Sequence, residues 1–230
     1  MAGERYKPRL VLLGKQGAGK GTQAARLAEH YGIAHLSTGE MFRDKAAQGT
    51  AFGLEAKRFM DAGELVPDEI VLGVVEECLA PDGPLGNGFV LDGFPRTAPQ
   101  AIELDRLLGS HGLDLVIDLE VPREIVLDRI AGRRVCENCQ RTYHVNMMPT
   151  HDATCDTCGG RVVQRDDDTE EAVERRLELY ELETVPILEY YRDHGLLAVI
   201  DGVGEGDEVF ERLLKVINDR ILSDTSHGAA

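Results

Sequence analysis

The sequence contains no tryptophan, and only 5% of its 230 residues are aromatic. Basic residues are also few: 25 lysines and arginines stand against 41 aspartates and glutamates, which gives a formal net charge of -16. Such a charge argues against broad binding of nucleic acid or an anionic membrane, but it leaves room for a local basic pocket that holds a small anion. No apolar run approaches the length of a membrane span, and the first eight residues lack the apolar core of a secretory signal. We therefore expect a soluble, cytoplasmic protein with no nucleic-acid or membrane partner.

Short apolar runs alternate with helical patterns along the chain. The runs mostly lack the apolar–polar alternation of half-exposed strands, as strands covered on both faces do; they are Arg9–Leu13, Phe89–Asp92, 115–119, Leu197–Asp201 and, more weakly, 33–36. Helical patterns lie between them, at Lys20–Tyr31, Asp68–Leu79, Ala98–Leu108, 123–132, 169–193 and 207–222. This order predicts an α/β fold with a five-stranded parallel sheet flanked by helices.

Two stretches break the alternation. Residues 37–66 have helical patterns with no strand between them, and residues 133–165 are rich in Cys, Thr, Asp and Gly with no sustained period. We expect both to be insertions into a core domain made of residues 1–36, 67–132 and 166–230. Within that core, Pro186 interrupts a long helical pattern and should kink it.

A glycine-rich segment, GKQGAGKGT at 14–22, directly follows the first predicted strand and precedes the first predicted helix. Its spacing is that of a phosphate-binding P-loop, in which backbone N–H groups turn inward around an anion and the helix dipole points at the same place. Lys20 adds a mobile positive charge for the outer phosphates. In contrast to the general pattern, Gly21 follows the lysine and the hydroxyl comes one position later, at Thr22. A tight turn without a ligand would explain neither Lys20 nor the helix.

These residues belong to a larger set of motifs that resembles the adenylate kinases, the nucleoside monophosphate kinases that use ATP to phosphorylate AMP. The resemblance covers nearly the whole chain, and its motifs occur in the family's order: GKQGAGKGTQ (14–23), LSTGEMFR (36–43), GELVPDEIV (63–71), LDGFPRTAPQA (91–101), DRIAGRR (128–134), and QRDDD with RRL (164–177). Gln16 departs from the proline that is usual at its position. UMP/CMP kinases share the P-loop but have a short second insertion, so the long 133–165 segment argues against them.

The resemblance implies a role for each matching residue. It implies an ATP site at Gly17, Ala18, Gly19, Lys20, Gly21, Thr22, Arg129, Arg133, Thr142, Tyr143 and the backbone of Gly204. It implies an AMP site at Thr38, Arg43, Glu64, Leu65, Val66, Gly93, Phe94, Pro95, Arg96, Gln100, Arg165 and Arg176. The expected catalytic residues are Lys20, Arg96, Arg129, Arg133, Arg165 and Arg176.

The residue types suit this chemistry. Phosphoryl transfer needs two anions in line, neutralised charge and exclusion of water, and no nucleophile from the protein. Arginine binds phosphate with two parallel hydrogen bonds, whereas a lone arginine is usually only a solvated surface charge. Asp92, at the end of a predicted strand, can hold Mg²⁺ through the ion's water shell, although it could also simply cap a turn.

Four of the five cysteines form a C-x2-C-x15-C-x2-C pattern at Cys136, Cys139, Cys155 and Cys158. This spacing is typical of a zinc site, and four thiolates leave no open coordination position for water. We therefore expect a structural Zn²⁺ that compensates for the small core of the second insertion. Four reduced thiols without metal are the alternative.

Taken together, the sequence predicts a P-loop core with an AMP-binding insertion at 37–66 and a zinc-containing lid at 133–165. The expected reaction is ATP + AMP ⇌ 2 ADP with Mg²⁺, which serves adenine nucleotide homeostasis, and the resemblance suggests a monomer. A kinase for another nucleoside monophosphate is the alternative enzyme. A zinc-ribbon protein that binds nucleic acid is the alternative of another class, and the net charge of -16 counts against it.

Overall fold

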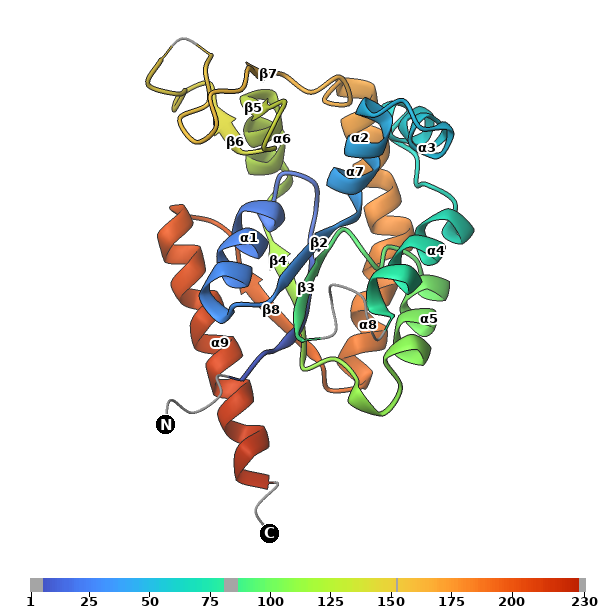
Figure 1. Cartoon of the computed structure of the whole chain (residues 1–230). Helices are drawn as coiled ribbons and strands as arrows, with labels where there is room; N and C mark the ends of the chain where they lie inside the picture. The colour runs from blue at the N-terminus through green and yellow to red at the C-terminus, as the bar shows by residue number, and fades with distance from the viewer. Residues whose placement is uncertain (1–5, 81–86, 152, 228–230) are drawn as a thin grey trace.

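The computed structural model describes residues 6–80, 87–151 and 153–227, with side chains up to residue 221. At its centre lies a five-stranded parallel sheet in the order β2-β3-β1-β4-β8 (Figure 1). The strands are β1 (Arg9–Leu13), β2 (Ala34–Ser37), β3 (Phe89–Asp92), β4 (Leu115–Glu120) and β8 (Leu197–Asp201). The predicted fold class is confirmed. Residues 1–5 and 228–230, the expected ends of the core domain, lie outside the described residues.

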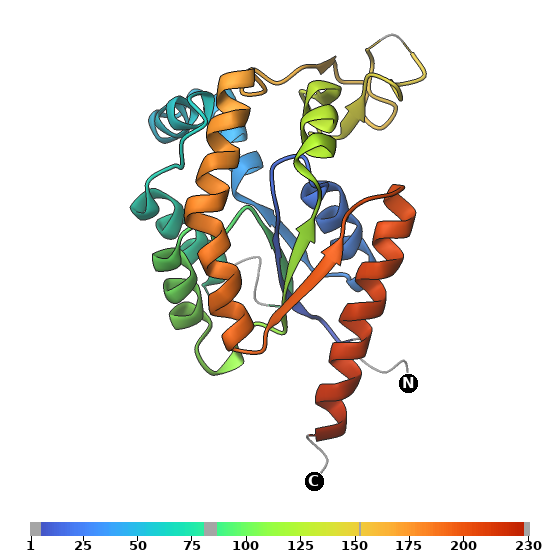
Figure 2. The same cartoon turned by 180° about the vertical axis from the view of Figure 1, so that it is seen from behind.

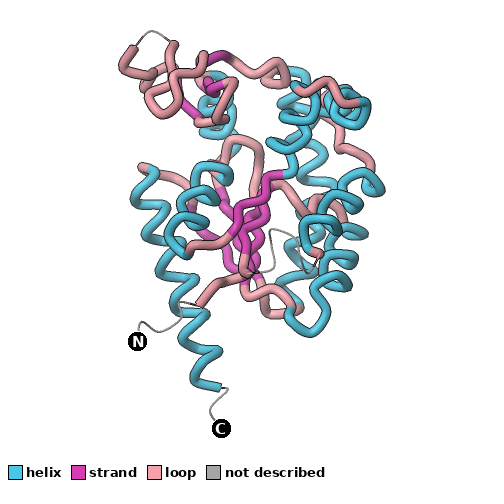
Figure 3. Tube along the Cα trace, in the orientation of Figure 1, coloured by secondary structure: helices cyan, strands magenta, loops and turns pink. Residues whose placement is uncertain are grey.

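Each face of the sheet carries its own apolar cluster. Leu10 and Leu12 of β1 pack in one cluster with residues of α1 (Lys20–Tyr31) and α9 (Gly206–His227). Val11 and Leu13, which alternate with them, pack in the other with residues of α4 (Asp68–Leu79), α5 (Ala98–Leu108) and α8 (Val185–Asp193). Figure 3 shows the strands enclosed by helices on both sides. This two-sided burial is why the strands are apolar at nearly every position.

The long helical pattern at 169–193 is not one regular helix. It consists of α7 (Glu170–Leu179), a π-helical turn at Tyr180–Thr184, and α8, which has Pro186 in its first turn. Proline has no N–H to donate within a helix, and the π-helical turn lies directly before it, with the Val185 N–H bonded to the carbonyl oxygen of Tyr180. Figure 2 shows the three segments running on as one long rod along the back of the molecule.

The first insertion forms two helices, α2 (Thr38–Ala47) and α3 (Ala51–Asp61), as predicted. The second, for which no regular element was expected, contains a small antiparallel sheet in the order β6-β5-β7. Its strands are β5 (Arg133–Cys136), β6 (Thr142–His144) and β7 (Val162–Val163). They are two to four residues long, too short for a recognisable period. Both insertions lie beyond the carboxyl ends of the central strands (Figure 1).

The remaining elements are α6 (Arg123–Ala131) and a 3₁₀ turn at Gly109–His111. Predicted boundaries shifted by at most a residue, except in α9, which extends five residues beyond the predicted end at 222. Among the described residues, no helix combines the length and the apolar character that a membrane crossing requires.

Candidate active site

The glycine loop forms a tight turn between β1 and α1. Gly17 and Gly19 adopt φ values of 82° and 100°, in the left-handed region that side chains rarely enter. At Gly17 a Cβ would also lie 2.8 Å from Cγ1 of Ile130 in α6. The loop therefore requires glycine both for its turn and for its close approach to α6, and α1 begins directly behind it at Lys20.

The ammonium group of Lys20 lies inside this loop. Its Nζ donates hydrogen bonds to the carbonyl oxygens of Gly14 at 2.7 Å and Lys15 at 2.8 Å. Burial lowers the pKa of Lys20 to about 8, and although Asp92 raises it, Arg96 adds to the lowering. A bound phosphate would relieve this penalty, because it supplies the negative charge that the buried ammonium lacks.

Two arginines at the base of the second insertion share one carboxylate. Arg165 donates from Nε to Oδ1 of Asp167 at 2.8 Å, and Arg176 donates from Nη2 to Oδ2 of the same residue at 2.7 Å. Asp167 is 4% exposed. Burial raises the pKa of its carboxyl group, but the hydrogen bond and positive charge of Arg165, followed by Arg176, lower it well below the usual range. Asp167 therefore holds two guanidinium groups side by side.

Further arginines approach the same space. Burial lowers the pKa of Arg43 to about 10, with the charge of Arg165 adding to the effect. Burial likewise lowers the pKa of Arg96, whose Nε donates to the carbonyl oxygen of Gly93 at 2.7 Å. Cations that repel one another in a buried site are stabilised when an anion binds between them.

The arginines beside the glycine loop are held by the protein itself. Arg129 donates to the carbonyl oxygens of Ala18 at 3.3 Å and Gly202 at 3.1 Å, and so connects the loop to the segment after β8. Arg133 pairs with Asp168 through two hydrogen bonds, of which the Nε–Oδ2 bond measures 2.9 Å. Both side chains thus have fixed positions before any ligand arrives.

Two polar side chains farther from the glycine loop, Thr38 and Gln100, also have fixed orientations. Thr38 Oγ1 donates to the carbonyl oxygen of Gly93 at 3.0 Å. Gln100 accepts from the backbone N–H of Arg96 at 2.8 Å and donates to Oδ1 of Asp68 at 2.6 Å. The amide of Gln100 therefore has one defined orientation, since a carboxylate only accepts hydrogen bonds.

One cavity of about 810 Å³ joins these groups. Nearly every predicted site residue lines it: Gly17, Ala18, Gly19, Lys20, Gly21, Thr22, Thr38, Arg43, Glu64, Leu65, Val66, Asp92, Gly93, Pro95, Arg96, Gln100, Arg129, Arg133, Thr142, Tyr143, Arg165, Arg176 and Gly204. Phe94 does not, because its ring is fully buried in the apolar cluster behind the site. The cavity is large enough for a sizeable organic ligand.

Asp92 lies beside the phosphate loop, where the chain could hold a hydrated cation. The carboxylate is 8% exposed, lines the cavity and interacts with the charge of Lys20. A Cβ on residue 21 would lie 3.3 Å from Oδ2 of Asp92. Gly21 thus leaves room for this carboxylate, which gives a physical reason for the unusual glycine after the lysine. A carboxylate next to bound phosphates fits the preference of Mg²⁺ for oxygen ligands and retained waters.

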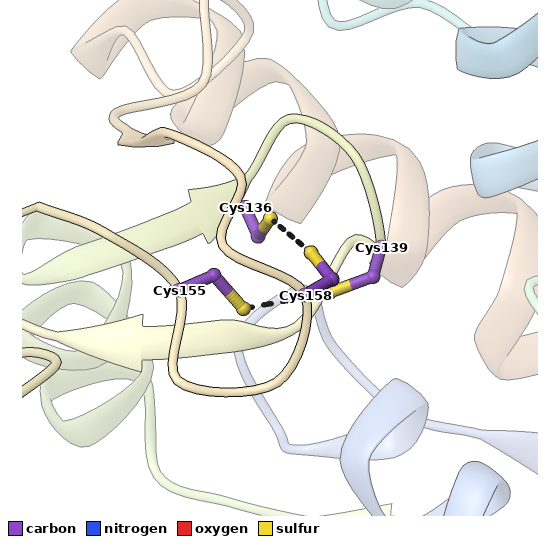
Figure 4. Close-up of side chains that lie close together, drawn as sticks. All are labelled: Cys136, Cys139, Cys155 and Cys158. Carbon is purple, nitrogen blue, oxygen red and sulfur yellow. Dashed lines mark hydrogen bonds between the residues drawn. The ribbon is translucent and has the colours of Figure 1, made fainter.

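The four cysteines of the second insertion converge, and their sulfur atoms all lie within 4.8 Å of one another (Figure 4). The Cys136–Cys158 and Cys139–Cys155 sulfur pairs are 3.4 and 3.6 Å apart. Tetrahedral zinc with Zn–S bonds of about 2.3 Å requires sulfur separations of roughly 3.8 Å, so the cluster fits the ion. In the described part of the chain, the buried apolar cluster at this place adds Tyr143 and Val162 to the cysteines. Because the Tyr143 hydroxyl donates to Cys155 Sγ at 3.3 Å, that side chain belongs to the cysteine cluster as well as to the cavity wall.

Several residues that support the site were missed at the sequence level. Asp168 lies in the motif QRDDD and Asp68 in the motif GELVPDEIV, but neither motif predicts that these carboxylates orient other site residues. Asp118 at the end of β4 accepts a hydrogen bond from Tyr180 of the π-helical turn at 3.0 Å. Burial raises the pKa of Asp118, whose charge also acts on Lys20. These contacts join residues far apart in the chain, so no local spacing reveals them.

Fold and site together define a P-loop phosphotransferase. The adenylate kinase family model matches residues 12–196. An adenylate kinase of Carboxydothermus hydrogenoformans is 52% identical over 206 residues, which cover 88% of this chain and 95% of that protein. Adenylate kinases of Streptomyces avermitilis and Clostridium perfringens are 49% and 46% identical, cover 91% of this chain each, and are themselves covered to 96% and 98%.

The chain belongs to the adenylate kinase family, which confirms the resemblance drawn from its motifs. It is an enzyme, and its relatives support phosphoryl transfer to a nucleoside monophosphate.

Proposed function

We propose that this enzyme catalyses ATP + AMP ⇌ 2 ADP and so balances the cell's adenine nucleotides. One observation carries the proposal: a single cavity has the phosphate loop at one end, Thr38 and Gln100 at the other, and buried arginines between them. Two nucleotides entering from opposite ends would bring their phosphate groups together among these arginines.

The donor end would bind ATP. The N–H groups of the loop from Gly17 to Thr22 would surround the phosphates, and Lys20 would neutralise the outermost of them. Arg129 and Arg133 would contact the same nucleotide, while the backbone of Gly204 and residues Thr142 and Tyr143 would enclose its base and ribose.

The acceptor end would bind AMP. Arg43 and Arg96 would hold its phosphate, and the backbone from Glu64 to Val66 would line the adenosine. Thr38 and Gln100 would select the base, since a fixed amide presents a defined donor and acceptor. Phe94 would support this end from the core behind it.

Transfer would depend on positioning and charge. Arg165 and Arg176, held together by Asp167, would lie where the γ-phosphoryl group passes between the nucleotides and would stabilise its negative charge. Mg²⁺ bound with ATP would neutralise further phosphate charge, and Asp92 would hold its water shell. Residues 37–66 and 133–165 would act as two mobile insertions on the core of residues 1–36, 67–132 and 166–230. Their closure would exclude water, which would otherwise hydrolyse ATP.

Structural zinc in the cysteine cluster would stabilise the second insertion without taking part in the reaction. Four protein ligands leave zinc no position for substrate or water. We further propose that the enzyme is a monomer, because one chain supplies both nucleotide sites. We also propose that it acts in the cytoplasm.

The test is a coupled assay of the purified enzyme with Mg-ATP against AMP, CMP, UMP and GMP. ADP formation with AMP and little with the other three is the expected result. Preference for another monophosphate would retain phosphoryl transfer but overturn the roles of Thr38 and Gln100. Absence of transfer to all four would overturn the proposed reaction.

A further inference from the structure

Gln16, in the phosphate loop, stands where the family usually has proline. Its Nε2 donates a hydrogen bond to Oδ1 of Asp168 at 3.1 Å. The nitrogen must face Asp168, because a carboxylate cannot donate a hydrogen bond. A proline side chain could not make this contact, so this connection is specific to chains with a donor at position 16.

Asp168 is the centre of a buried network. Its side chain is fully buried, and it also accepts two hydrogen bonds from Arg133, whose side chain is 14% exposed. Arg133 begins the second insertion, and Asp168 follows shortly after its end. The carboxylate therefore connects both ends of this insertion, and Gln16 attaches that junction to the phosphate loop.

The other amide atom of Gln16 indicates that packing alone does not explain the residue. Its Oε1 is buried and has no hydrogen-bond partner among the described residues, although Gln16 lines the cavity. A buried amide oxygen without a partner lowers stability, so an apolar residue or proline would suit a purely structural role better.

We propose that Gln16 is a positioning residue for the ATP site: through Asp168 it fixes Arg133 relative to the phosphate loop. This inference rests on the proposed role of Arg133 in binding ATP. A guanidinium held in place before the nucleotide arrives loses less conformational freedom on binding. The affinity for the donor nucleotide, ATP, should therefore be higher. The AMP end of the cavity should be unaffected, because among the described residues no side-chain hydrogen bond of Gln16 or Asp168 reaches Thr38, Arg43 or Gln100.

The test compares Gln16→Met, which keeps the length of the side chain and removes the hydrogen bond, with wild type. Gln48→Met, at an exposed position, is the matched control. We expect Gln16→Met to raise KM for Mg-ATP about three- to tenfold, because the Arg133 side chain must then be ordered when the nucleotide binds. KM for AMP should stay near the wild-type value, and the melting temperature should fall by no more than a few degrees for the lost hydrogen bond. In Gln48→Met all three quantities should be unchanged.

A second comparison asks whether the effect passes through Asp168. Gln16→Met is introduced into an Asp168→Ala background, where it should no longer change KM for Mg-ATP. If Asp168→Ala does not fold, Asp168→Asn serves as the background, and the effect should fall by more than about half because the charge is gone.

An unchanged KM for Mg-ATP in Gln16→Met would overturn the inference. So would an equal effect in both backgrounds, or a rise in KM for both nucleotides together with a lower melting temperature. Failure of the proposed function is distinguishable, because the wild-type enzyme itself would then form no ADP from ATP and AMP.

Discussion

The carboxylate of Asp68 fixes the orientation of the Gln100 amide. Asp68 accepts from Gln100 Nε2 at 2.6 Å and from Thr97 Oγ1 at 3.0 Å, while Gln100 Oε1 accepts from the backbone N–H of Arg96 at 2.8 Å. Rotating the amide by 180° would bring oxygen against oxygen and N–H against N–H. Gln100 therefore presents one remaining N–H and one remaining lone pair for contact with a base.

Asp68→Ala should weaken binding of AMP and reduce the preference for adenine. Without Asp68 the Gln100 amide is free to rotate, and ordering it when AMP binds costs about 0.5–1.5 kcal/mol, which corresponds to a rise in KM for AMP of roughly two- to tenfold. Steady-state kinetics with AMP, CMP and UMP measure both effects. Glu69→Ala is the control, since Glu69 is an exposed carboxylate in the same first turn of α4. Equal changes in the two variants would show that charge at the start of the helix matters and the contact with Gln100 does not.

The buried Lys20 should give the enzyme an alkaline limit. Its folded pKa of about 8 lies below the ordinary lysine value of 10.5, so the free enzyme loses this cation as pH rises through 8. Since kcat/KM reports the free enzyme, kcat/KM for Mg-ATP should fall above about pH 8. The effect on stability has the opposite sign. Between pH 8 and 10.5 this lysine binds more protons in the unfolded chain than in the folded one, so its contribution to the free energy of unfolding of the nucleotide-free enzyme rises with pH.

Lys20→Arg separates this effect from other groups, because arginine keeps its charge at alkaline pH. The variant should have a lower kcat/KM at pH 7, as its larger head does not fit the carbonyl oxygens of Gly14 and Lys15, but its profile should stay flat above pH 8. A decline at the same pH in both proteins would assign the limit to another group.

Asp167 should contribute far more to stability than its neighbour Asp166. Asp167→Ala leaves Arg165 and Arg176 buried beside each other without their carboxylate, which typically costs about 3–5 kcal/mol. The Asp166 side chain is 85% exposed and lies 3.6 Å from Lys57, so Asp166→Ala should cost less than about 1 kcal/mol. Urea unfolding at pH 7 measures both free energies.

The dependence on pH supplies an independent check on Asp167. Its folded pKa lies below the unfolded value of about 3.9, so its contribution is complete above that pH and is lost as pH falls below it. The difference between wild type and Asp167→Ala should therefore shrink below about pH 4. A difference that persists unchanged to pH 2.5 would mean that packing, and not the ion pairs, causes the loss.

The central sheet and its helices could be predicted because their signal is local. Strands buried on both faces are apolar throughout, as in Val11 and Leu12, and the glycine loop identifies the edge where ligands bind. The short strands of the second insertion could not be predicted, since they are two to four residues long and have no recognisable period. The π-helical turn could not be predicted from periodicity either. Its residues Tyr180 and Thr184 form hydrogen bonds with Asp118 and with the backbone of Arg96, and Pro186 follows it in the chain.

The sequence could predict only part of the site as well. Residues expected to face a ligand belong to recognisable motifs, and nearly all line the cavity. The residues that orient them also lie in these motifs, but the motifs do not show which residues meet: Asp68 and Gln100 are 32 positions apart, and Arg133 and Asp168 are 35. Such pairs depend on how the elements pack, so they become visible only in three dimensions. Phe94 is the converse case, a motif residue whose side chain serves the core.

The cysteine cluster should control the thermal stability of the second insertion. Among the described residues its buried core consists of Cys136, Tyr143, Cys155 and Val162, which is small for a segment of this size, so we expect the segment to need a metal in order to fold. Cys136→Ser, or removal of zinc by a chelator, should lower the melting temperature by several degrees and change kcat little at low temperature. Cys78→Ser, outside the insertion, is the control. Bound zinc, measured by elemental analysis, should fall in Cys136→Ser and stay constant in Cys78→Ser. If chelation leaves the melting temperature unchanged, the four thiols do not depend on a metal.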